Sequence, residues 1–239
     1  MNYRVILSYL SRCSIPLVRP KSWDLFTREP AEVKKFVREH EQSLSPDQLA
    51  ALEHYGFAGY FDINRHLRGE INVPEAEEFI DSIDDALGRN TLKTDITVYR
   101  GIDTAYGVKH PILSRLVQLG AISLKHNRIE NKRIVFENIG LLPRLRGFKF
   151  VEPSYVSTSI KRGLFGMRDL QLRILVPHGT HAIFLNAMHQ FDGDSGVKDF
   201  GGHKSEQELL LDRGLTFEVV AIQPIDGNSK LLVDLRVDS

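Results

Sequence analysis

Apolar residues change their spacing near Thr94, and this change constrains the fold more than any other feature of the chain. Up to about Arg89 they recur three or four positions apart, as along one face of an amphipathic helix. From Ile96 onward they gather in short runs bounded by turn residues, as in strands. Helices that precede the strands, instead of alternating with them, favour an α+β domain over a doubly wound parallel sheet.

Three helices are expected in the first part of the chain. Ser45, Pro46 and Gln48 form the pattern of a helix start, with Ser45 as the N-cap and Gln48 closing a capping box. A second helix is expected over residues 60–69 and a third over residues 74–87, because the apolar residues in both keep helical spacing.

Strand-like runs make up most of the second part, and turn residues such as Asp212-Arg213-Gly214 separate them. The expected strands cover residues 96–99, 155–159, 170–176, 182–185, 207–211, 216–222 and 231–235. Between residues 107 and 149 the pattern is ambiguous. A helix is expected there at about 111–119, and we interpret the rest of that stretch as a connector.

A single domain accounts for the whole chain of 239 residues. We expect an N-terminal extension (1–44), a helical part (45–93) and a β-rich part (94–239) that carries an insertion at 107–149.

The charge balance and the N-terminus bear on partners and location. The 31 basic and 31 acidic side chains cancel, which gives no electrostatic reason to expect a nucleic-acid partner. The one cysteine, Cys13, permits no intramolecular disulfide. No run is long and apolar enough for a membrane span. Ser8, Ser11 and Arg12 interrupt the first apolar run, so we expect a soluble protein without a cleavable signal peptide.

Three polar segments lie at or beside expected strands: Tyr99-Arg100-Gly101, Ser157-Thr158-Ser159 and Glu206-Gln207-Glu208. Residues two apart on a strand project from the same face, so Glu206 and Glu208 present neighbouring carboxylates, which is costly without a cation or donor between them. Each segment alone has a simpler explanation, as a strand end, a polar edge strand or a solvent-facing strand. Their combination, in this order, indicates a site.

Together these segments resemble the Arg–Ser–Glu signature of the ADP-ribosyltransferase toxin-like superfamily. Residues 55–69 are similar to the family's N-terminal helix, and residues 206–217 to its glutamate strand and the following turn. The resemblance covers roughly Ser45 to the C-terminus, although the interval from Arg100 to Ser157 is longer than the family pattern. It implies N-terminal helices packed on a mostly antiparallel split β-sandwich. It also implies a mono-ADP-ribosyltransferase that uses NAD and no metal, a toxin or effector secreted or delivered into a target cell.

The resemblance also implies roles for single residues. Arg100, with Gly101, would clamp the NAD pyrophosphate with paired donors that a lysine lacks. Glu208 would stabilise the oxocarbenium-like state that forms as the nicotinamide–ribose bond breaks, and Ser157 would position Glu208 by a hydrogen bond. Glu206 would orient the acceptor and take its proton, and Glu-x-Glu in this family accompanies transfer to arginine.

Further contacts are implied around these residues. Four of them complete the NAD site: Tyr60, Asn64, Thr158 and Ser159. Phe165 follows the Ser-Thr-Ser strand and would either stack on the nicotinamide or anchor a short turn. Phe191 and Phe200 lie in the loop before Glu206, where the family recognises its target protein, and the glycines and aspartates of that loop suit a surface position.

Other functions fit the sequence less well. Four histidines gather in one region without a zinc-binding pattern: His178, His181, His189 and His203. A nicotinamide-dependent dehydrogenase lacks its Gly-x-Gly-x-x-Gly turn here. Hydrolysis of NAD to free ADP-ribose would use the same residues with water as the acceptor. A non-enzymatic interaction module of the same fold is the most distant alternative.

Overall fold

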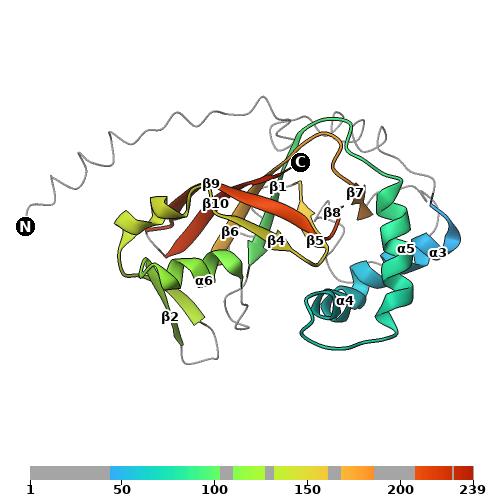
Figure 1. Cartoon of the computed structure of the whole chain (residues 1–239), viewed down its shortest axis with the longest axis horizontal. Coiled ribbons are helices and arrows are strands. Elements are labelled where there is room, and N and C mark those ends of the chain that lie inside the picture. Colours follow the sequence, from blue (N-terminus) through green and yellow to red (C-terminus); the bar gives the residue numbers. More distant parts are fainter. Residues whose placement is uncertain are drawn as a thin grey trace, which may run out of the picture.

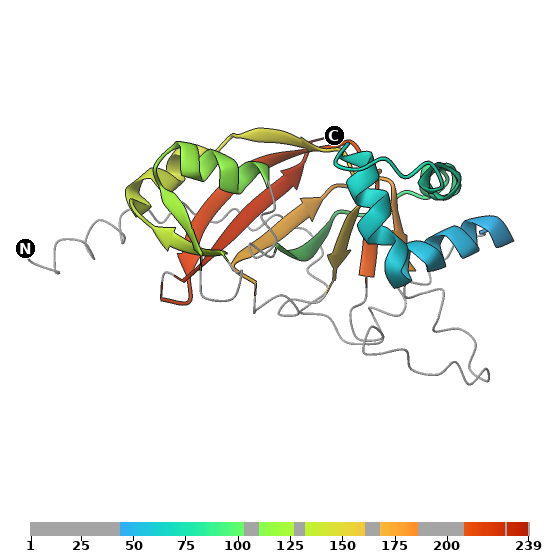
Figure 2. The ribbon, with the colours of Figure 1, turned by 90° about the horizontal axis from the view of Figure 1, so that it is seen from below.

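The described part of the chain is α+β, as the sequence predicts. The structure, a computed structural model, describes residues 44–102, 110–126, 132–160, 168–185, 208–227 and 229–238. Helices come first along the chain and most of the strands follow. The first helices gather at one end of the molecule and a smaller group of elements at the other, with the large sheet between them (Figures 1 and 2).

The first three helices form one layer. They are α3 (Pro46–His54), α4 (Tyr60–Leu67) and α5 (Ala76–Gly88). The capping box is confirmed: the Ser45 hydroxyl accepts from the Gln48 backbone N–H at 3.2 Å, and the Gln48 side-chain oxygen accepts from the Ser45 N–H at 2.8 Å. Between α3 and α4 lies a π-helical turn, η2 (Tyr55–Gly59), which the spacing of apolar residues did not predict. A Cβ on Gly59 would lie 2.9 Å from the His54 carbonyl oxygen, so this turn requires glycine.

Eight strands form one sheet in the order β4-β9-β10-β6-β1-β5-β8-β7. All neighbours are antiparallel except the pair β6–β10. The strands are β1 (Ile96–Ile102), β4 (Lys149–Glu152), β5 (Val156–Ser159), β6 (Leu170–Val176), β7 (Ala182–Phe184), β8 (Glu208–Leu211), β9 (Leu215–Ile225) and β10 (Lys230–Val237).

The stretch between β1 and β4 holds more structure than the sequence predicts. The expected helix is present as α6 (Pro111–Gln118). The interpretation of the rest as a connector is wrong: it forms a hairpin of β2 (Ile122–His126) and β3 (Lys132–Phe136), followed by a 3-10 helix, η3 (Ile139–Leu145). The hairpin and α6 pack their apolar residues into the main core, so this segment helps to build the domain.

Alternate residues of β5 and β8 serve two separate apolar clusters, one on each face of the sheet. Tyr155 and Leu210 pack with the helices α3 and α5, whereas Val156, Leu209 and Leu211 pack in the larger cluster with α6 and η3. Side chains that share a face with Tyr155 and Leu210 therefore point toward the layer of helices.

The division into a split sandwich stays a prediction, since the described strands join into one continuous sheet. Its weakest point among them is the junction of β1 with β5, which pair at one position, Tyr99 with Ser159. In contrast, β1 pairs with β6 along its full length. Within the described residues, no helix is long and apolar enough to cross a membrane.

Candidate active site

Ser157 and Glu208 are joined by a hydrogen bond between neighbouring strands. The Ser157 hydroxyl donates to Glu208 Oε1 at 2.5 Å. Ser157 lies two residues after Tyr155, and Glu208 two residues before Leu210, so both point toward the helices. Both side chains are partly exposed. This bond involves Oε1 of Glu208, so Ser157 helps to hold the carboxylate in one orientation.

The helical layer adds polar groups on the same side of the sheet. The Asn64 side-chain amide donates to the Tyr55 hydroxyl oxygen at 3.0 Å, and both residues are buried. Asn64 Oδ1 is also buried and has no hydrogen-bond partner in the described structure. An unpaired buried acceptor costs about 1–3 kcal/mol, so a ligand that donates to it gains affinity there. Tyr60 is half exposed and meets Tyr55 edge to face, with ring centroids 6.5 Å apart.

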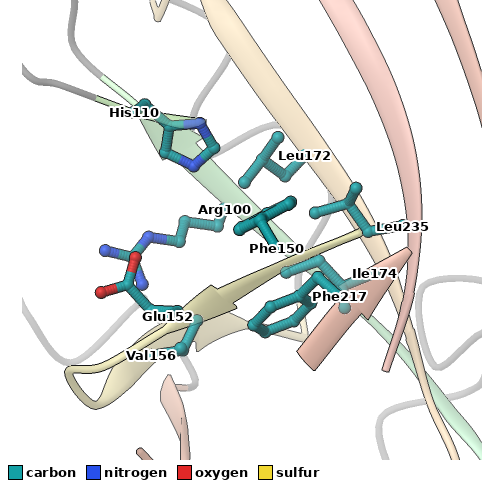
Figure 3. Close-up of a pocket in the computed structure, with 9 residues that line it drawn as sticks. All are labelled: Arg100, His110, Phe150, Glu152, Val156, Leu172, Ile174, Phe217 and Leu235. Carbon is teal, nitrogen blue, oxygen red and sulfur yellow. The ribbon is translucent and has the colours of Figure 1, made fainter. Parts of the chain in front are cut away.

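The side chain of Arg100 leaves β1 on the face of the sheet opposite to that of Ser157. Its neighbours Val98 and Ile102 pack in the larger core, whereas Ser157 faces the helices. Figure 3 shows its guanidinium directed at the carboxylate of Glu152, and both residues line one small pocket. The charges of Arg100 and Glu208 nevertheless influence each other: the negative charge of Glu208 raises the pKa of Arg100 and so opposes its desolvation.

Arg68 and Glu152 belong to the same cluster, although the sequence analysis assigned a role to neither. Arg68 Nε donates to Glu152 Oε1 at 3.1 Å, and Ser154 donates to the same oxygen through its hydroxyl at 2.6 Å. Arg68 is the C-cap of α4 and lies in the segment 55–69 that carries the family resemblance, so its position was matched but its partner was not. Glu152 is 84 positions away in the sequence, so no local pattern connects it to Arg68.

Burial and charge shift the ionisation of these groups. Desolvation lowers the pKa of Arg100, and the negative charge of Glu152 opposes that shift. Desolvation is also the largest influence on the pKa of Glu152 and raises it, but the hydrogen bonds from Ser154 and the charge of Arg68 more than compensate and lower it overall. Burial raises the pKa of the Tyr55 hydroxyl, which therefore keeps its proton. Around Glu152 the site thus presents two cations, Arg68 and Arg100, and a protonated phenol, with Glu208 as a second carboxylate.

Two of the predicted NAD contacts are covered in this structure. Thr158 and Ser159 are each 1% exposed. Thr158 donates through its hydroxyl to the Leu209 carbonyl oxygen at 2.7 Å, so its side chain holds β5 to β8. Gly101 follows Arg100 on β1 and is partly exposed.

Other predicted residues cannot be placed. The described residues do not include Glu206, Phe165, Phe191 or Phe200. Nor do they include His189 or His203, two of the four histidines of the rejected zinc interpretation. Of the other two, His181 contacts the Leu87 carbonyl oxygen through Nδ1 at 3.0 Å, and His178 is exposed. In the described part of the chain no three metal-ligating side chains gather.

This chain is similar to several known bacterial proteins. The epidermal cell differentiation inhibitor of Staphylococcus aureus is 24% identical over 216 residues, which cover 83% of this chain and 76% of that protein. Plx2a, an ADP-ribosyltransferase toxin from Paenibacillus larvae, has a similar fold with a TM-score of 0.60 at 24% identity, covering 86% of this chain and 92% of Plx2a.

A further structure is that of BECa, an ADP-ribosylating toxin of a binary enterotoxin of C. perfringens, solved with NADH. It has a TM-score of 0.62 at 20% identity, and the match covers 89% of this chain and 49% of BECa. The model of the ADP-ribosyltransferase exoenzyme family matches residues 33–238, which is most of the chain. The chain therefore belongs to the ADP-ribosyltransferase exoenzyme family.

Proposed function

We propose that this protein transfers one ADP-ribose from NAD to an arginine side chain of a target protein and releases nicotinamide. The observation that carries the proposal is the hydrogen bond from Ser157 to Glu208, which faces the polar groups of the helical layer. Membership in the family supports NAD as the substrate, and the NADH bound to BECa agrees with it.

Glu208 acts on the glycosidic bond. As the bond between nicotinamide and ribose C1′ breaks, its electron pair leaves with nicotinamide and positive charge develops on the ribose. The Glu208 carboxylate stabilises that charge and accepts a hydrogen bond from the ribose 2′-hydroxyl. Ser157 keeps the carboxylate in this orientation through its 2.5 Å hydrogen bond.

Arginines hold the other end of NAD. Arg100 and Arg68 both lie beside Glu152, and their combined charge attracts the doubly charged pyrophosphate. Asn64 Oδ1 accepts from a hydroxyl or amide of NAD, which supplies its missing partner. Tyr60 provides an exposed ring at the edge of the site. Thr158 and Ser159 support the strand that carries Ser157, and Gly101 leaves room beside Arg100.

Glu206 acts on the acceptor, since Glu-x-Glu is the arginine-associated form of this motif. A guanidinium is protonated and a poor nucleophile, so a carboxylate beside it must orient it and take a proton. The new bond joins the arginine nitrogen to ribose C1′, and the proton passes to Glu206. Phe165 stacks on nicotinamide, and Phe191 and Phe200 contact the target protein. Because its relatives are toxins, we also propose that the protein acts after secretion or delivery into a target cell.

The test of the glycosidic step is Glu208→Gln. Without its charge the oxocarbenium-like state loses about 3–4 kcal/mol, so both ADP-ribosyl transfer and NAD hydrolysis fall on the order of a hundred- to a thousandfold. Release of labelled nicotinamide measures both. Glu218→Gln is the matched control, because Glu218 lies on β9 in a surface ion pair with Arg236 at 2.7 Å. Full activity in Glu208→Gln would refute the role of Glu208.

Glu206→Gln tests the acceptor step with agmatine, a small guanidine that replaces the target protein. ADP-ribosyl-agmatine is expected to disappear, while slow hydrolysis to free ADP-ribose continues because water needs less activation. If wild type releases ADP-ribose but never modifies agmatine or arginine peptides, the protein is an NAD glycohydrolase or uses another acceptor. If wild type neither binds nor cleaves NAD, the fold serves as an interaction module.

A further inference from the structure

Ser154 holds the Glu152 carboxylate in place. Its Oε1 accepts from the Ser154 hydroxyl at 2.6 Å and from the Ser154 backbone N–H at 3.3 Å. Both contacts are local, two residues along the chain, so they form whenever the segment between β4 and β5 is folded. Glu152 is also largely covered, with 12% of its side chain exposed. The carboxylate is therefore held in place independently of any arginine.

Arg68 docks onto this fixed carboxylate from the helical layer. Its Nε donates to Glu152 Oε1 at 3.1 Å, and 29% of its side chain remains exposed. A hydrogen bond through Nε leaves the two terminal amino groups of the guanidinium outside that bond. A long arginine side chain loses rotamer freedom when it is fixed, so one that is already held loses less freedom when it binds an anion.

A second arginine, Arg100, also faces the Glu152 carboxylate. Its guanidinium points at the same carboxylate from β1 (Figure 3), so two cations converge on one anion. The positive charges of the two guanidiniums repel each other, and Glu152 is the carboxylate that compensates both. Their electrostatic influence on Glu152 is opposite in sign to its desolvation, which keeps the carboxylate ionised and the cluster intact.

We propose that Glu152 is a positioning residue: it holds the guanidinium of Arg68 in place so that Arg68 and Arg100 together receive the NAD pyrophosphate. The inference rests on the proposed function. On electrostatics alone, the negative charge of Glu152 beside the pyrophosphate site should weaken NAD binding. Positioning predicts the opposite, that Glu152 strengthens it. The sign of the effect of removing the charge therefore distinguishes positioning from plain repulsion.

Glu152→Gln measures that sign, because glutamine keeps the size and one acceptor oxygen but loses the charge. We expect the Kd for NAD, measured by titration calorimetry, to rise about fivefold, and that of Glu152→Ala about tenfold. The KM should rise in parallel while kcat stays within about threefold, since only substrate binding is disturbed. Tighter NAD binding by Glu152→Gln would overturn the proposal, and so would unchanged binding by both variants.

A double-mutant cycle shows whether Glu152 acts through Arg68. In an Arg68→Ala background, Glu152→Ala is expected to change the Kd less than about twofold, because its partner is gone. If the two losses instead multiply, Glu152 acts independently of Arg68 and the proposal fails.

The matched control is Asp234→Asn. It neutralises the acid of another partly buried ion pair, Arg173–Asp234, whose side chains are 30% and 15% exposed, nearly the values of Arg68 and Glu152. It should lower the melting temperature without changing the Kd for NAD. Wild type is assayed first with NAD and agmatine: if it binds NAD and modifies agmatine, the proposed function stands whatever Glu152 does, and if it neither binds nor cleaves NAD, both proposals fall.

Discussion

Ser157 and Glu208 depend on each other across a strand pair. The register places Ser159 opposite Glu208 and Ser157 opposite Leu210, so the serine hydroxyl reaches the carboxylate diagonally along one face of the sheet. A hydrogen bond to a charged group contributes about 1.5–3 kcal/mol, more than a bond between neutral groups. The Ser157 hydroxyl therefore contributes to the positional precision of Glu208.

Ser157→Ala is expected to lower kcat about 10- to 100-fold while KM for NAD changes little, because the carboxylate is misoriented but still charged. Initial rates of nicotinamide release measure both constants. Ser114→Ala is the control, since Ser114 is exposed on α6. A change confined to KM would mean that Ser157 contacts NAD directly instead of positioning Glu208.

The sequence identified Ser157 and Glu208 as a pair but not the pairing of Arg68 with Glu152, and the reason is physical. The first two lie in motifs whose order along the chain is informative on its own. The second two form one ion pair across 84 positions, between the end of a helix and the end of a strand. Only the packing of the helical layer against the sheet brings them together, and no spacing of residues records that packing.

The spacing of apolar residues predicted the regular helices and strands but not the irregular elements. The strand 170–176 was predicted to the residue, because apolar and polar positions alternate through it. The hairpin of β2 and β3 was missed, since its strands form a small separate sheet and its sequence shows no turn pattern of the common two-residue type. The π-helical turn at Tyr55–Gly59 depends on tertiary packing and leaves no periodic signal.

Helix α6 begins at a buried histidine that must stay neutral. His110 is 6% exposed, and its Nδ1 accepts from the Ile112 backbone N–H at 3.3 Å. Desolvation, aided by the positive charge of Arg100, lowers the pKa of His110 to about 4. An unfolded chain binds that proton at a pKa of about 6.5, so protonation favours unfolding. This contribution to stability is complete above pH 6.5 and disappears as the pH falls toward 4.

His110→Asn tests this, because asparagine caps a helix but does not titrate. Between pH 6.5 and 4 the free energy of unfolding of wild type should fall by up to about 3 kcal/mol more than that of the variant. Urea unfolding at several pH values gives the two slopes. The absolute stability of the variant is not the readout, since the smaller side chain leaves space beside Phe150. Parallel pH profiles would show that His110 does not carry the acid sensitivity.

Among the polar contacts that join the layer of helices to the sheet, the largest described cluster is centred on Asp84. The Tyr155 hydroxyl donates to Asp84 on α5 at 2.5 Å, and Arg213, from the turn after β8, donates to the same carboxylate through Nε at 3.0 Å. Tyr155 also packs edge to face on Tyr55, with ring centroids 5.7 Å apart. One aspartate on a helix thus fixes both strands that carry Ser157 and Glu208.

Asp84→Asn should loosen the helical layer before it affects the sheet. Asparagine keeps an acceptor for Tyr155 but leaves Arg213 without its counter-charge, and because the pair is partly exposed the loss of stability is about 1–2 kcal/mol. Amides of α3, α4 and α5 are then expected to exchange hydrogen faster, while those of β6, β9 and β10 keep their protection. Saturating NAD should restore the helical amides, since the proposed ligand contacts both layers and stabilises their joined form. Hydrogen exchange followed by mass spectrometry measures each segment, and Glu218→Gln, which breaks an ion pair within the sheet, is the control. Equal loss of protection in the helices and the sheet would show that the two layers open as one unit and that Asp84 is not a specific join between them.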